Sequence, residues 1–446
     1  MKVTKKLDLS QRYSFPSEIQ TIRYDGRIII IAPSCLTWIV LDNEAQLHFF
    51  NLLKSLSISE AISSQNFSEE DIRNTLTQIE ARGFSGHPAA RIDSRENTTH
   101  MQFFLTDGCN LRCPHCLMNA TRKSDNELTT AEVCATLEAF KNNGGEVVTF
   151  SGGEIGLRDD LLEIVSYCST IGLKADLLTN GTLWTEDIVR QISKSLGRVQ
   201  VSIDGFSEES NARIRGKGNF EKSLHAVDMF VRAGVKVEVA VTPMLTDALE
   251  SEIPLYIAWA DSLKKKYEGC DFNFHFTAEL VDGRNVKLTA EQQERFGRIM
   301  TSINNGYFGE DSEAEAFISY VKAGDRKDGC AFGSFNVRAN GDVYTCGRVA
   351  SLKPVANIRR DDLQTVFQNL RRLTLLSCVD NLSPCKLCAL RYFCGGECRI
   401  KYFDSFAMLD DIKHLPEKER LTRKCDPSFK EHFYKLMIET NTRLWS

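Results

Sequence analysis

Between residues 100 and about 305 the sequence alternates strand-like and helix-like segments, and this alternation limits the possible folds more than any other feature. Six apolar runs have the length and composition of strands, and amphipathic segments with helical spacing separate them. Because crossovers between parallel strands are right-handed, this order predicts an α/β fold: a parallel sheet curled into a partial, TIM-like (β/α)6 barrel. The predicted strands are Met101–Thr106, Glu146–Phe150, Lys174–Leu178, Arg198–Ile203, Val235–Val241 and Phe272–Ala278; the predicted helices include Thr130–Lys141, Asp159–Thr170, Glu186–Ser195, Phe220–Ala233 and Leu249–Lys266.

Residues 1–85 predict a small winged-helix-like domain. Three short apolar runs, separated by turns at Asp25-Gly26 and Pro33-Ser34, are typical of strands. Three helical segments follow, and the last begins at the capping sequence Ser68-Glu-Glu-Asp71. Residues 86–99 are polar and lack periodicity, so they predict a linker between this domain and the barrel of residues 100–305. The strands are expected at Ile19–Tyr24, Arg27–Ala32 and Thr37–Leu41, and the helices at Glu44–Leu56, Ile58–Ile62 and Ser68–Gly83.

The charge and hydropathy of the chain exclude several classes of protein. Its 446 residues carry a net charge of -5, which gives no general attraction to nucleic acid or anionic lipid. The first residues are basic, but no apolar segment of a secretory signal follows them. No apolar run approaches the roughly 20 residues that span a bilayer. We therefore expect a cytoplasmic protein.

Fifteen cysteines need an explanation in such a protein, and eight of them lie in residues 306–446. A reducing cytoplasm and an odd count both argue against a disulfide framework. The C-terminal region also has few long apolar runs, so bound metal is expected to contribute to its stability. Spacing therefore has to show which cysteines bind metal.

The segment GCNLRCPHCLMN places Cys109, Cys113 and Cys116 directly after the first predicted barrel strand. Loops at the carboxyl ends of barrel strands carry the chemistry in such folds. A structural zinc ion and a cubane iron–sulfur cluster both usually take four protein ligands, and this loop supplies three. Either a zinc site is incomplete here, or one iron of a cubane is left open for a small molecule.

The spacing Cys-x3-Cys-x2-Cys, with His115 before the last cysteine, resembles the signature of radical S-adenosylmethionine (SAM) enzymes. The resemblance implies that the amino and carboxylate groups of SAM occupy the open iron. It further implies that an electron from the reduced cluster cleaves the sulfonium to give a 5′-deoxyadenosyl radical. His115 is then expected to pack beside the adenine.

Polar residues at the ends of the next three strands fit the same resemblance. Ser151-Gly152-Gly153-Glu154 resembles the GGE loop that contacts the methionyl amine, and Arg215 resembles an arginine that pairs with the methionyl carboxylate. Each residue taken alone has an ordinary structural explanation as a turn or a cap, and the order along the strands is what favours a cofactor pocket. The remaining residues expected to line that pocket are Thr179, Asn180, Ser202 and Asp204.

Seven C-terminal cysteines resemble the SPASM extension of radical enzymes that modify peptides and proteins. The resemblance implies two auxiliary [4Fe-4S] clusters, hence three in all. The inner cluster lacks an obvious fourth thiolate; a substrate thiolate, Cys270 or Cys378 could supply it. Zinc held by the same thiols is the alternative. The resemblance assigns Cys385, Cys388, Cys394 and Cys425 to the outer cluster and Cys330, Cys346 and Cys398 to the inner one.

Two kinds of relative compete for the function. Anaerobic sulfatase-maturating enzymes place an aspartate directly after the cysteine that corresponds to Cys346, whereas this chain has Gly347. Residues 1–85 instead resemble the peptide-recognition element of ribosomal-peptide maturases, which binds a leader peptide by adding it to a sheet edge. The alternative for this domain is a DNA-binding winged helix, as in a zinc-binding regulator. Residues 1–91 contain ten Lys/Arg and ten Asp/Glu, a balance that offers no basic surface for phosphates.

These features predict a radical SAM maturase that installs a thioether or carbon–carbon crosslink in a ribosomally made precursor peptide. A flavodoxin- or ferredoxin-type electron donor is implied by the resemblance, and neither nucleic acid nor membrane is an expected partner. The sequence identifies no catalytic base or hydrogen donor. It also does not distinguish crosslinking from epimerisation or dehydrogenation, because these reactions share one radical generator.

Overall fold

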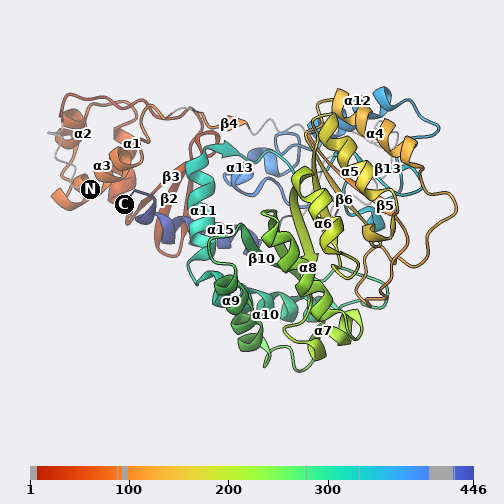
Figure 1. The fold of residues 1–446 in the computed structure, drawn as a ribbon. Helices are drawn as coiled ribbons and strands as arrows, with labels where there is room; N and C mark the ends of the chain where they lie inside the picture. The colour runs from red at the N-terminus through yellow and green to blue at the C-terminus, as the bar shows by residue number, and fades with distance from the viewer. Residues whose placement is uncertain are drawn as a thin grey trace.

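The computed structural model describes residues 8–87, 89–92, 99–277, 279–330, 332–400, 425 and 427–445. Its centre is a nine-stranded sheet in the order β10-β9-β8-β7-β6-β5-β12-β13-β14. The six strands from β5 to β10 are parallel and follow chain order, which confirms the predicted barrel (Figure 1). The sheet begins at β10 and ends at β14, and these two edge strands do not pair with each other, so the barrel is partial. These strands are β5 His100–Thr106, β6 Val147–Gly152, β7 Lys174–Thr179, β8 Leu196–Ser202, β9 Lys236–Val241 and β10 Phe272–Phe276; Ala278, the predicted end of the last strand, lies outside the described residues.

Helices cover the outer face of the barrel sheet, where the amphipathic segments predicted them. Thr129 and Glu132 form a complete capping box at the start of α4, as the sequence of that segment favours. Three further helices of this part, α7, α10 and α11, were not among the predicted ones. The helices are α4 Thr130–Asn142, α5 Leu161–Thr170, α6 Glu186–Ile192, α7 Glu208–Arg215, α8 Phe220–Arg232, α9 Ile253–Lys266, α10 Ala290–Phe308 and α11 Ser312–Ala323, with short 3-10 turns at Ile155–Leu157 and Ser193–Ser195.

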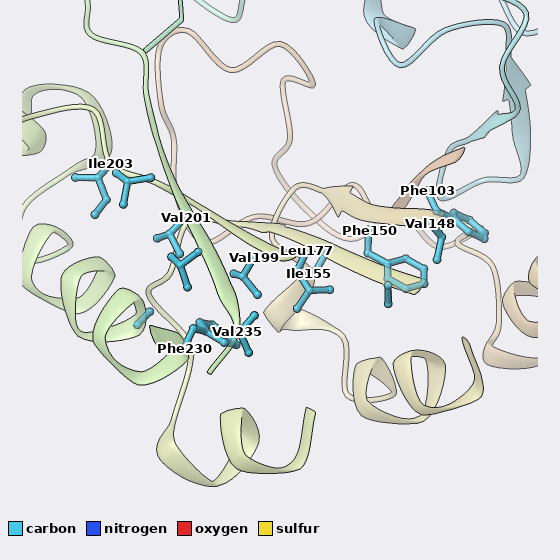
Figure 2. Close-up of a cluster of buried hydrophobic side chains, with 14 of the residues drawn as sticks. Phe103, Val148, Phe150, Ile155, Leu177, Val199, Val201, Ile203, Phe230 and Val235 are labelled. Carbon is cyan, nitrogen blue, oxygen red and sulfur yellow. The ribbon is translucent and has the colours of Figure 1, made fainter. Parts of the chain in front are cut away.

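The main core lies between the sheet and these helices (Figure 2). Phe150, Leu177 and Val199 on adjacent strands are fully buried, and Phe230 from α8 packs onto the same core. Strands covered by helices in this way carry near-continuous apolar runs. This packing fixes the strand ends, and therefore fixes the loops that carry the candidate site.

The barrel sheet continues into the C-terminal region. Strand β12 (Asn336–Val337) lies parallel to β5 and antiparallel to β13 (Asp342–Tyr344), which pairs with β14 (Ala356–Asn357). Phe335 and Phe367, the latter on α12 (Leu363–Leu376), join the main core. This part of residues 306–446 therefore also has a core, and the expected contribution of bound metal to the stability of the region stays a prediction. Strands of two and three residues are too short to show a period in the sequence.

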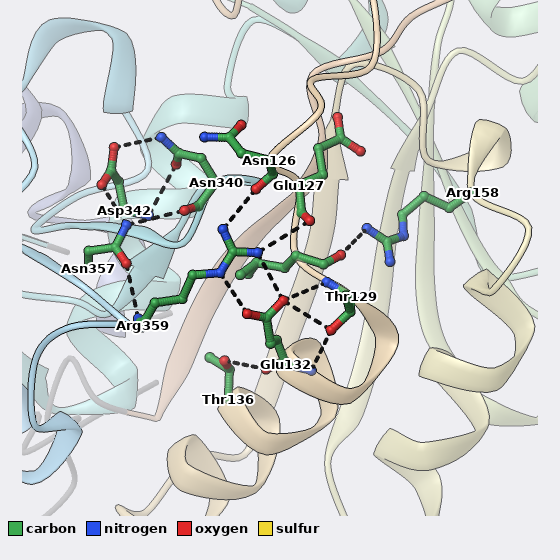
Figure 3. Close-up of polar contacts among 11 residues, drawn as sticks. Asn126, Glu127, Thr129, Glu132, Thr136, Arg158, Asn340, Asp342, Asn357 and Arg359 are labelled. Atoms are coloured by element: carbon green, nitrogen blue, oxygen red, sulfur yellow. Dashed lines mark hydrogen bonds and ion pairs between the residues drawn. The ribbon is translucent and has the colours of Figure 1, made fainter.

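A polar contact also joins the C-terminal region to α4 (Figure 3). Arg359 donates to both carboxylate oxygens of Glu132, at 2.6 and 2.9 Å, and to the carbonyl of Asn126 at 3.0 Å. The Arg359 guanidinium lowers the pKa of Glu132 to about 2. Glu132, which belongs to the capping box of α4, thus also holds the segment that follows β14.

The N-terminal domain has the predicted order, an antiparallel sheet β1-β2-β3 followed by three helices. Ser57 and Ser68 cap α2 and α3 as their sequences indicate. One side of the sheet packs on these helices through Ile28 and Ile30 of β2. The elements are β1 Gln20–Tyr24, β2 Arg27–Ala32, a 3-10 turn Pro33–Cys35, β3 Thr37–Leu41, α1 Glu44–Leu52, α2 Ile58–Ser64 and α3 Glu69–Ala81.

The other side of this sheet packs on the C-terminal region. Ile29 and Ile31 belong to a second core, shared with Cys385 and Met437. Trp38 Nε1 donates to the carbonyl of Met437 at 2.9 Å, and α15 lies beside β2 and β3 in Figure 1. The first and last parts of the chain therefore share one core. The remaining C-terminal elements are a 3-10 turn Val349–Ser351, another at Cys385–Leu387, α13 Arg391–Cys394, α15 Pro427–Thr440 and a turn at Arg443–Trp445.

The predicted linker contains a short strand. Residues Arg91–Ile92 form β4, which pairs in parallel with β11, Asp325–Arg326. Positions 88 and 93–98 of the predicted linker lie outside the described residues. Among the helices that the structure describes, none has the length and apolar character needed to cross a bilayer.

Candidate functional site

The three-cysteine loop leaves the carboxyl end of β5, and its two ends are joined to each other. Cys109 N donates to the carbonyl of Thr121 at 3.2 Å, and Thr121 N donates to that of Asp107 at 3.0 Å. From inside the loop, Arg112 donates to the carbonyls of Cys109 and Thr121, at 3.0 and 3.3 Å. The chain between these residues is a closed ring whose thiols can be held in a fixed arrangement.

The thiols of this ring lie close together and are partly buried. Burial raises the pKa of Cys109, and the neighbouring thiols of Cys113 and Cys116 raise it further. Burial also raises the pKa of Cys113, while the Arg215 guanidinium acts in the opposite direction. The Leu111 N–H donates to Cys109 Sγ at 3.4 Å. Crowded thiols with a nearby cation and an N–H donor suit thiolates bound to a metal.

The segment after β10 reaches across to the same ring. Asn285 N donates to the carbonyl of Pro114 at 2.7 Å, and Arg284 N to that of Cys116 at 3.1 Å. The Arg284 side chain donates to Asn119 Oδ1 at 2.8 Å and also to the carbonyl of Ala120. The sequence analysis missed Arg284. A lone arginine beyond the last strand carries no motif that could have indicated this role.

The turn after β6 packs directly on the cysteine ring. A Cβ on Gly153 would lie 1.9 Å from the carbonyl oxygen of Gly108, so no larger residue fits there without moving the ring. Gly152 has φ +140°, which favours glycine. Glu154 N donates to the same Gly108 carbonyl at 2.8 Å. The predicted Gly-Gly-Glu segment is therefore in contact with the cysteine loop.

Glu154 is fully buried and joins the ends of β6 and β7. Its carboxylate accepts from Thr179 Oγ1 at 2.6 Å, from Asn180 N at 2.7 Å and from Gly156 N at 3.1 Å. A carboxylate has about four acceptor positions, so three are filled from within the protein. The Glu154 carboxylate therefore mainly holds Thr179 and Asn180 in place, and about one of its acceptor positions is left for a ligand.

Asp204, Arg215 and His115 form a buried group next to Cys113. Asp204 Oδ2 lies 2.6 Å from Arg215 Nε and 3.3 Å from His115 Nε2. Asp204 Oδ1 accepts from Thr242 N at 2.9 Å. Burial lowers the pKa of His115, so its ring is neutral at pH 7, and its buried Nδ1 has no hydrogen-bond partner among the described residues. Ser202, also predicted for this pocket, is half-buried at the end of β8, two residues before Asp204.

The four cysteines predicted for an outer cluster come together. Cys385, Cys388, Cys394 and Cys425 line one pocket, which Phe429 of α15 also lines. Tyr434 also lies close to this group. Burial raises the pKa of Tyr434 to about 12, and the neighbouring thiols of Cys388 and Cys425 add to this effect. Cys425 lies 31 residues after Cys394 in the sequence, and the fold returns it to the other three cysteines of this pocket.

The three cysteines predicted for an inner cluster are also neighbours. Burial raises the pKa of Cys346, and the thiols of Cys330 and Cys398 add to it. Of the two suggested fourth ligands, Cys270 is exposed and precedes β10, at the amino-terminal edge of the sheet. Cys378 lies in the same part of the fold, since Val379 N donates to the carbonyl of Asp328 at 2.7 Å. The fourth ligand of the inner cluster stays a prediction, with Cys378 the nearer of the two in the fold.

A cavity of about 720 Å³ lies inside the barrel and extends between the two cysteine regions. Leu117 and Met118, directly after Cys116, line it on one side, and Cys346 lines it on another. Its remaining lining comes largely from inward-facing positions of β5, β6 and β8. A ligand in this cavity would lie between the three-cysteine ring and the inner cysteine group.

The Radical SAM superfamily model matches residues 103–256, the segment that carries the cysteine ring, Glu154 and the Asp204 group. This segment is a radical SAM domain. Among curated relatives, an AdoMet-dependent heme synthase of Oleidesulfovibrio alaskensis is 35% identical over 160 residues, covering 35% of this chain and 39% of the relative. The mycofactocin maturase MftC of Mycolicibacterium smegmatis is 26% identical over 326 residues, covering 69% of this chain and 79% of the relative.

Solved structures share the fold of a large part of the chain. Native anSMEcpe with bound AdoMet is 19% identical, covers 77% of this chain and 97% of its own, and aligns with a TM-score of 0.56. That likeness bears on the fold only. The chain spans less than half of the length of the first heme synthase relative, so shared identity there is confined to part of each protein.

The residues present in the radical SAM domain fit a three-thiolate cluster and SAM. A structural zinc ion takes four protein ligands, whereas a cubane can be held by three thiolates that each bind a different iron. The Arg215 guanidinium beside the ring supplies a cation for a carboxylate-bearing ligand, and His115 Nδ1, without a partner among the described residues, is left as a buried acceptor because Nε2 faces the Asp204 carboxylate.

Proposed function

We propose that the chain is a radical SAM maturase that modifies a ribosomally made precursor peptide, by a thioether or carbon–carbon crosslink. The observation that carries the proposal is the closed three-cysteine ring in contact with a buried Asp204–Arg215 pair, inside a radical SAM domain. When bound, the cluster and SAM supply a 5′-deoxyadenosyl radical that abstracts hydrogen from a substrate carbon. The domains proposed are residues 1–85 for leader recognition, 86–99 as linker, 100–305 as barrel and 306–446 as SPASM domain.

In this proposal the protein's own residues hold and orient the cofactors. Cys109, Cys113 and Cys116 ligate the cluster, and Arg215, fixed through Nε by Asp204, presents its remaining N–H groups to the methionyl carboxylate. Gly152 and Gly153 allow close approach of the backbone, and Glu154 keeps one acceptor position for the amine. The pocket is completed by His115, Thr179, Asn180 and Ser202.

Two auxiliary clusters complete the proposed cofactor set. The outer one is held by Cys385, Cys388, Cys394 and Cys425, and the shared pocket supports that grouping. The inner one is held by Cys330, Cys346 and Cys398, with a fourth position for Cys378 or a substrate thiolate. A flavodoxin- or ferredoxin-type protein supplies the electron. Three cubanes predict about twelve irons per chain.

A peptide substrate is supported by the relative named a maturase and by the N-terminal domain. Both edges of the β1-β2-β3 sheet lack a partner strand among the described residues, so a leader peptide could extend the sheet at either edge. Relatives named heme synthase match the barrel as well, so identity alone does not select the substrate. The domain before the barrel is what favours a peptide.

A sulfatase-maturing type of protein oxidation is the alternative function. It would need a proton acceptor after the cysteine corresponding to Cys346, and Gly347 stands there. A Cβ on Gly347 would lie 2.4 Å from Gln102 Oε1, so the amide of Gln102 fills the space where such a side chain would be. This arrangement favours the peptide-crosslinking proposal.

The first experiment tests the radical SAM chemistry. Anaerobically reconstituted protein, reduced with dithionite, should convert SAM to 5′-deoxyadenosine and contain about twelve irons. Changing Cys109, Cys113 and Cys116 together to Ala should abolish cleavage and leave about eight irons. Cleavage that persists in this variant would refute the site, and zinc in place of iron would favour a zinc-binding regulator.

The second experiment tests the leader site and uses, as candidate precursors, short peptides encoded by any small open reading frames found next to this gene. Binding should slow amide hydrogen exchange in one edge strand, β1 or β3, and leave the other edge unchanged. Protection of neither strand, with turnover intact, would favour the sulfatase type of reaction. Point variants are preferable to deletion of residues 1–85, because deletion would remove Ile29, Ile31 and Trp38 from the shared core and expose their C-terminal partners, such as Met437.

A further inference from the structure

The cavity in the barrel is layered, and the layers follow from strand register. Gln102 on β5 stands beside Thr149 on β6, and Asn336 on β12 stands beside Gln102 on the other side. Across the sheet the same row continues through Asp176 to Arg198. This lower row is polar in all five strands, although it faces the inside of a barrel.

The row above it, nearer the cysteine ring, is more apolar. Two residues further along β5, Phe104 stands beside Ser151, and Leu178 stands beside Gln200. Leu117 and Met118 add two more apolar side chains from the loop after Cys116, and Met118 packs with Phe104. Two strand residues span about 7 Å, which is the length of one long side chain.

The lower row keeps hydrogen-bonding capacity for a ligand. The carboxamide of Gln102 forms no hydrogen bond with the described residues, and its oxygen rests against Gly347 Cα. Thr149 Oγ1 contacts His100 Nε2 at 2.9 Å and has further capacity as a hydroxyl. Burial lowers the pKa of His100, so this pair is uncharged at pH 7.

Charges around the cavity are already matched. Arg198 lies 3.5 Å from Asp176 and 3.6 Å from Glu238, and Arg348 lies 2.9 Å from Glu279. No Asp or Glu is among the described residues that line the cavity. A cationic ligand would therefore find no carboxylate facing it, and an anionic one would compete with ion pairs that exist. An uncharged polar group needs no countercharge and does not compete with these ion pairs.

We propose that this cavity selects the substrate residue by an uncharged side chain about 7 Å long that ends in a hydroxyl or a carboxamide. The polar end hydrogen-bonds Gln102 and Thr149, and the carbon skeleton lies along the apolar wall that Phe104 and Met118 form, next to the cysteine ring. Gln102 and Thr149 are then specificity-determining residues. This inference rests on the proposed function, which makes the ligand a side chain of a peptide. It adds the kind of side chain that the cavity accepts.

The test uses small probes that share one ring and differ in the head group. Binding to anaerobically reconstituted protein is measured by saturation-transfer NMR for p-cresol, 4-methylbenzamide, toluene, 4-methylbenzoate and protonated 4-methylbenzylamine. The two neutral polar probes should bind about fivefold more tightly than the other three, as one additional hydrogen bond provides. Gln102→Leu and Thr149→Val should each remove most of this preference.

A surface variant, Gln364→Leu on α12, serves as the matched control and should keep the preference. Iron content and thermal unfolding of each variant show whether it has folded. Equal binding of all five probes, or tightest binding of a charged one, would overturn the inference, as would a preference that survives in both cavity variants. None of these readouts depends on SAM cleavage, so a failure of the proposed function would be seen separately, in the 5′-deoxyadenosine assay.

Discussion

Arg391 and Glu18 form a two-pronged ion pair between parts of the chain that are 373 residues apart. Arg391 Nη1 donates to Glu18 Oε1 at 2.7 Å, and Nη2 bonds the other carboxylate oxygen. Arg391 lies between Cys388 and Cys394, and its side chain is only 7% exposed. Glu18 precedes β1, so an edge of the N-terminal sheet is tied directly to the proposed outer-cluster loop.

Glu18→Ala should therefore loosen the outer-cluster loop. Arg391 would keep Asp380, 3.4 Å away, and the carbonyl of Cys388, 3.3 Å from Nη1, and would lose two charge-assisted hydrogen bonds in a mostly buried position. We expect a loss of about 2 kcal/mol in the free energy of unfolding, less than for a fully buried pair because Glu18 is about one third exposed. Iron release to a chelator should be faster than in the parent protein. Glu294→Ala, which breaks an exposed pair on α10, is the control and should change neither quantity.

Asp204→Asn should weaken SAM binding through Arg215. The variant keeps the bond from Thr242 N to Oδ1 but leaves the buried guanidinium without a countercharge. The expected cost is about 3 kcal/mol in stability, and SAM affinity, measured by equilibrium dialysis with the reconstituted protein, should fall at least tenfold. Asp187→Asn removes an exposed charge on α6 and is the matched control. Unchanged affinity with normal iron content would contradict a positioning role for Asp204.

The barrel was predictable from sequence because its two periodicities are strong. Predicted and observed bounds of β5 to β10 agree within about two residues at most ends. The four isoleucines of β2 were predicted as a strand, but their partner on one side is α15, about 400 residues later. The local sequence does not indicate a contact with such a distant segment. Strands β12 to β14 were missed because two or three residues are too short to show a period.

The candidate site was predictable only where residue spacing carries chemistry. Cysteine spacing gave the ring and the outer group, which the fold brings together. Pairing of Asp204 with Arg215 and His115 depends on how the loops after β5 and β8 and the helix α7 meet, and no spacing encodes it. Arg284 was missed for the same reason, since its contacts cross from the last barrel strand to the first.

Gly153→Ala should displace the cysteine ring. The added Cβ would collide with the backbone carbonyl of Gly108, which cannot move without shifting Cys109. We expect the variant to lose about four irons per chain, those of the radical SAM cluster, and to lose SAM cleavage. Gly156→Ala, whose Cβ would meet its nearest neighbour at 3.3 Å, is the control in the same loop. Full iron content in Gly153→Ala would show that the ring tolerates the shift.

The contact between α11 and α15 should depend on pH in the neutral range. His432 Nε2 lies 2.7 Å from Glu313 Oε1, and this hydrogen bond raises the pKa of His432. A histidine with a raised pKa contributes its full stability below the unfolded value, about 6.5, and loses it as pH rises through the folded value. Because the pair is exposed, the contribution should be below about 1 kcal/mol. Urea unfolding at pH 6, 7 and 8.5 should show a decline that His432→Asn and Glu313→Gln both abolish; an equal decline in both variants would contradict this assignment.

Arg284→Met should release the cysteine ring from the far side of the barrel. The change removes the bonds to Asn119 Oδ1 and the Ala120 carbonyl while keeping a side chain of similar length. The backbone bonds from Arg284 N and Asn285 N remain, so the ring should loosen without the protein unfolding. We expect the radical SAM cluster to lose iron at least severalfold faster under a chelator, while the two proposed auxiliary clusters, whose cysteines Arg284 does not contact among the described residues, lose iron at the parent rate. Arg295→Met on α10 is the matched control, because its ion pairs at 3.9 and 3.7 Å are with the surface residues Asp247 and Glu250. A uniform acceleration at all three clusters would mean that Arg284 supports the fold as a whole and does not act on the ring.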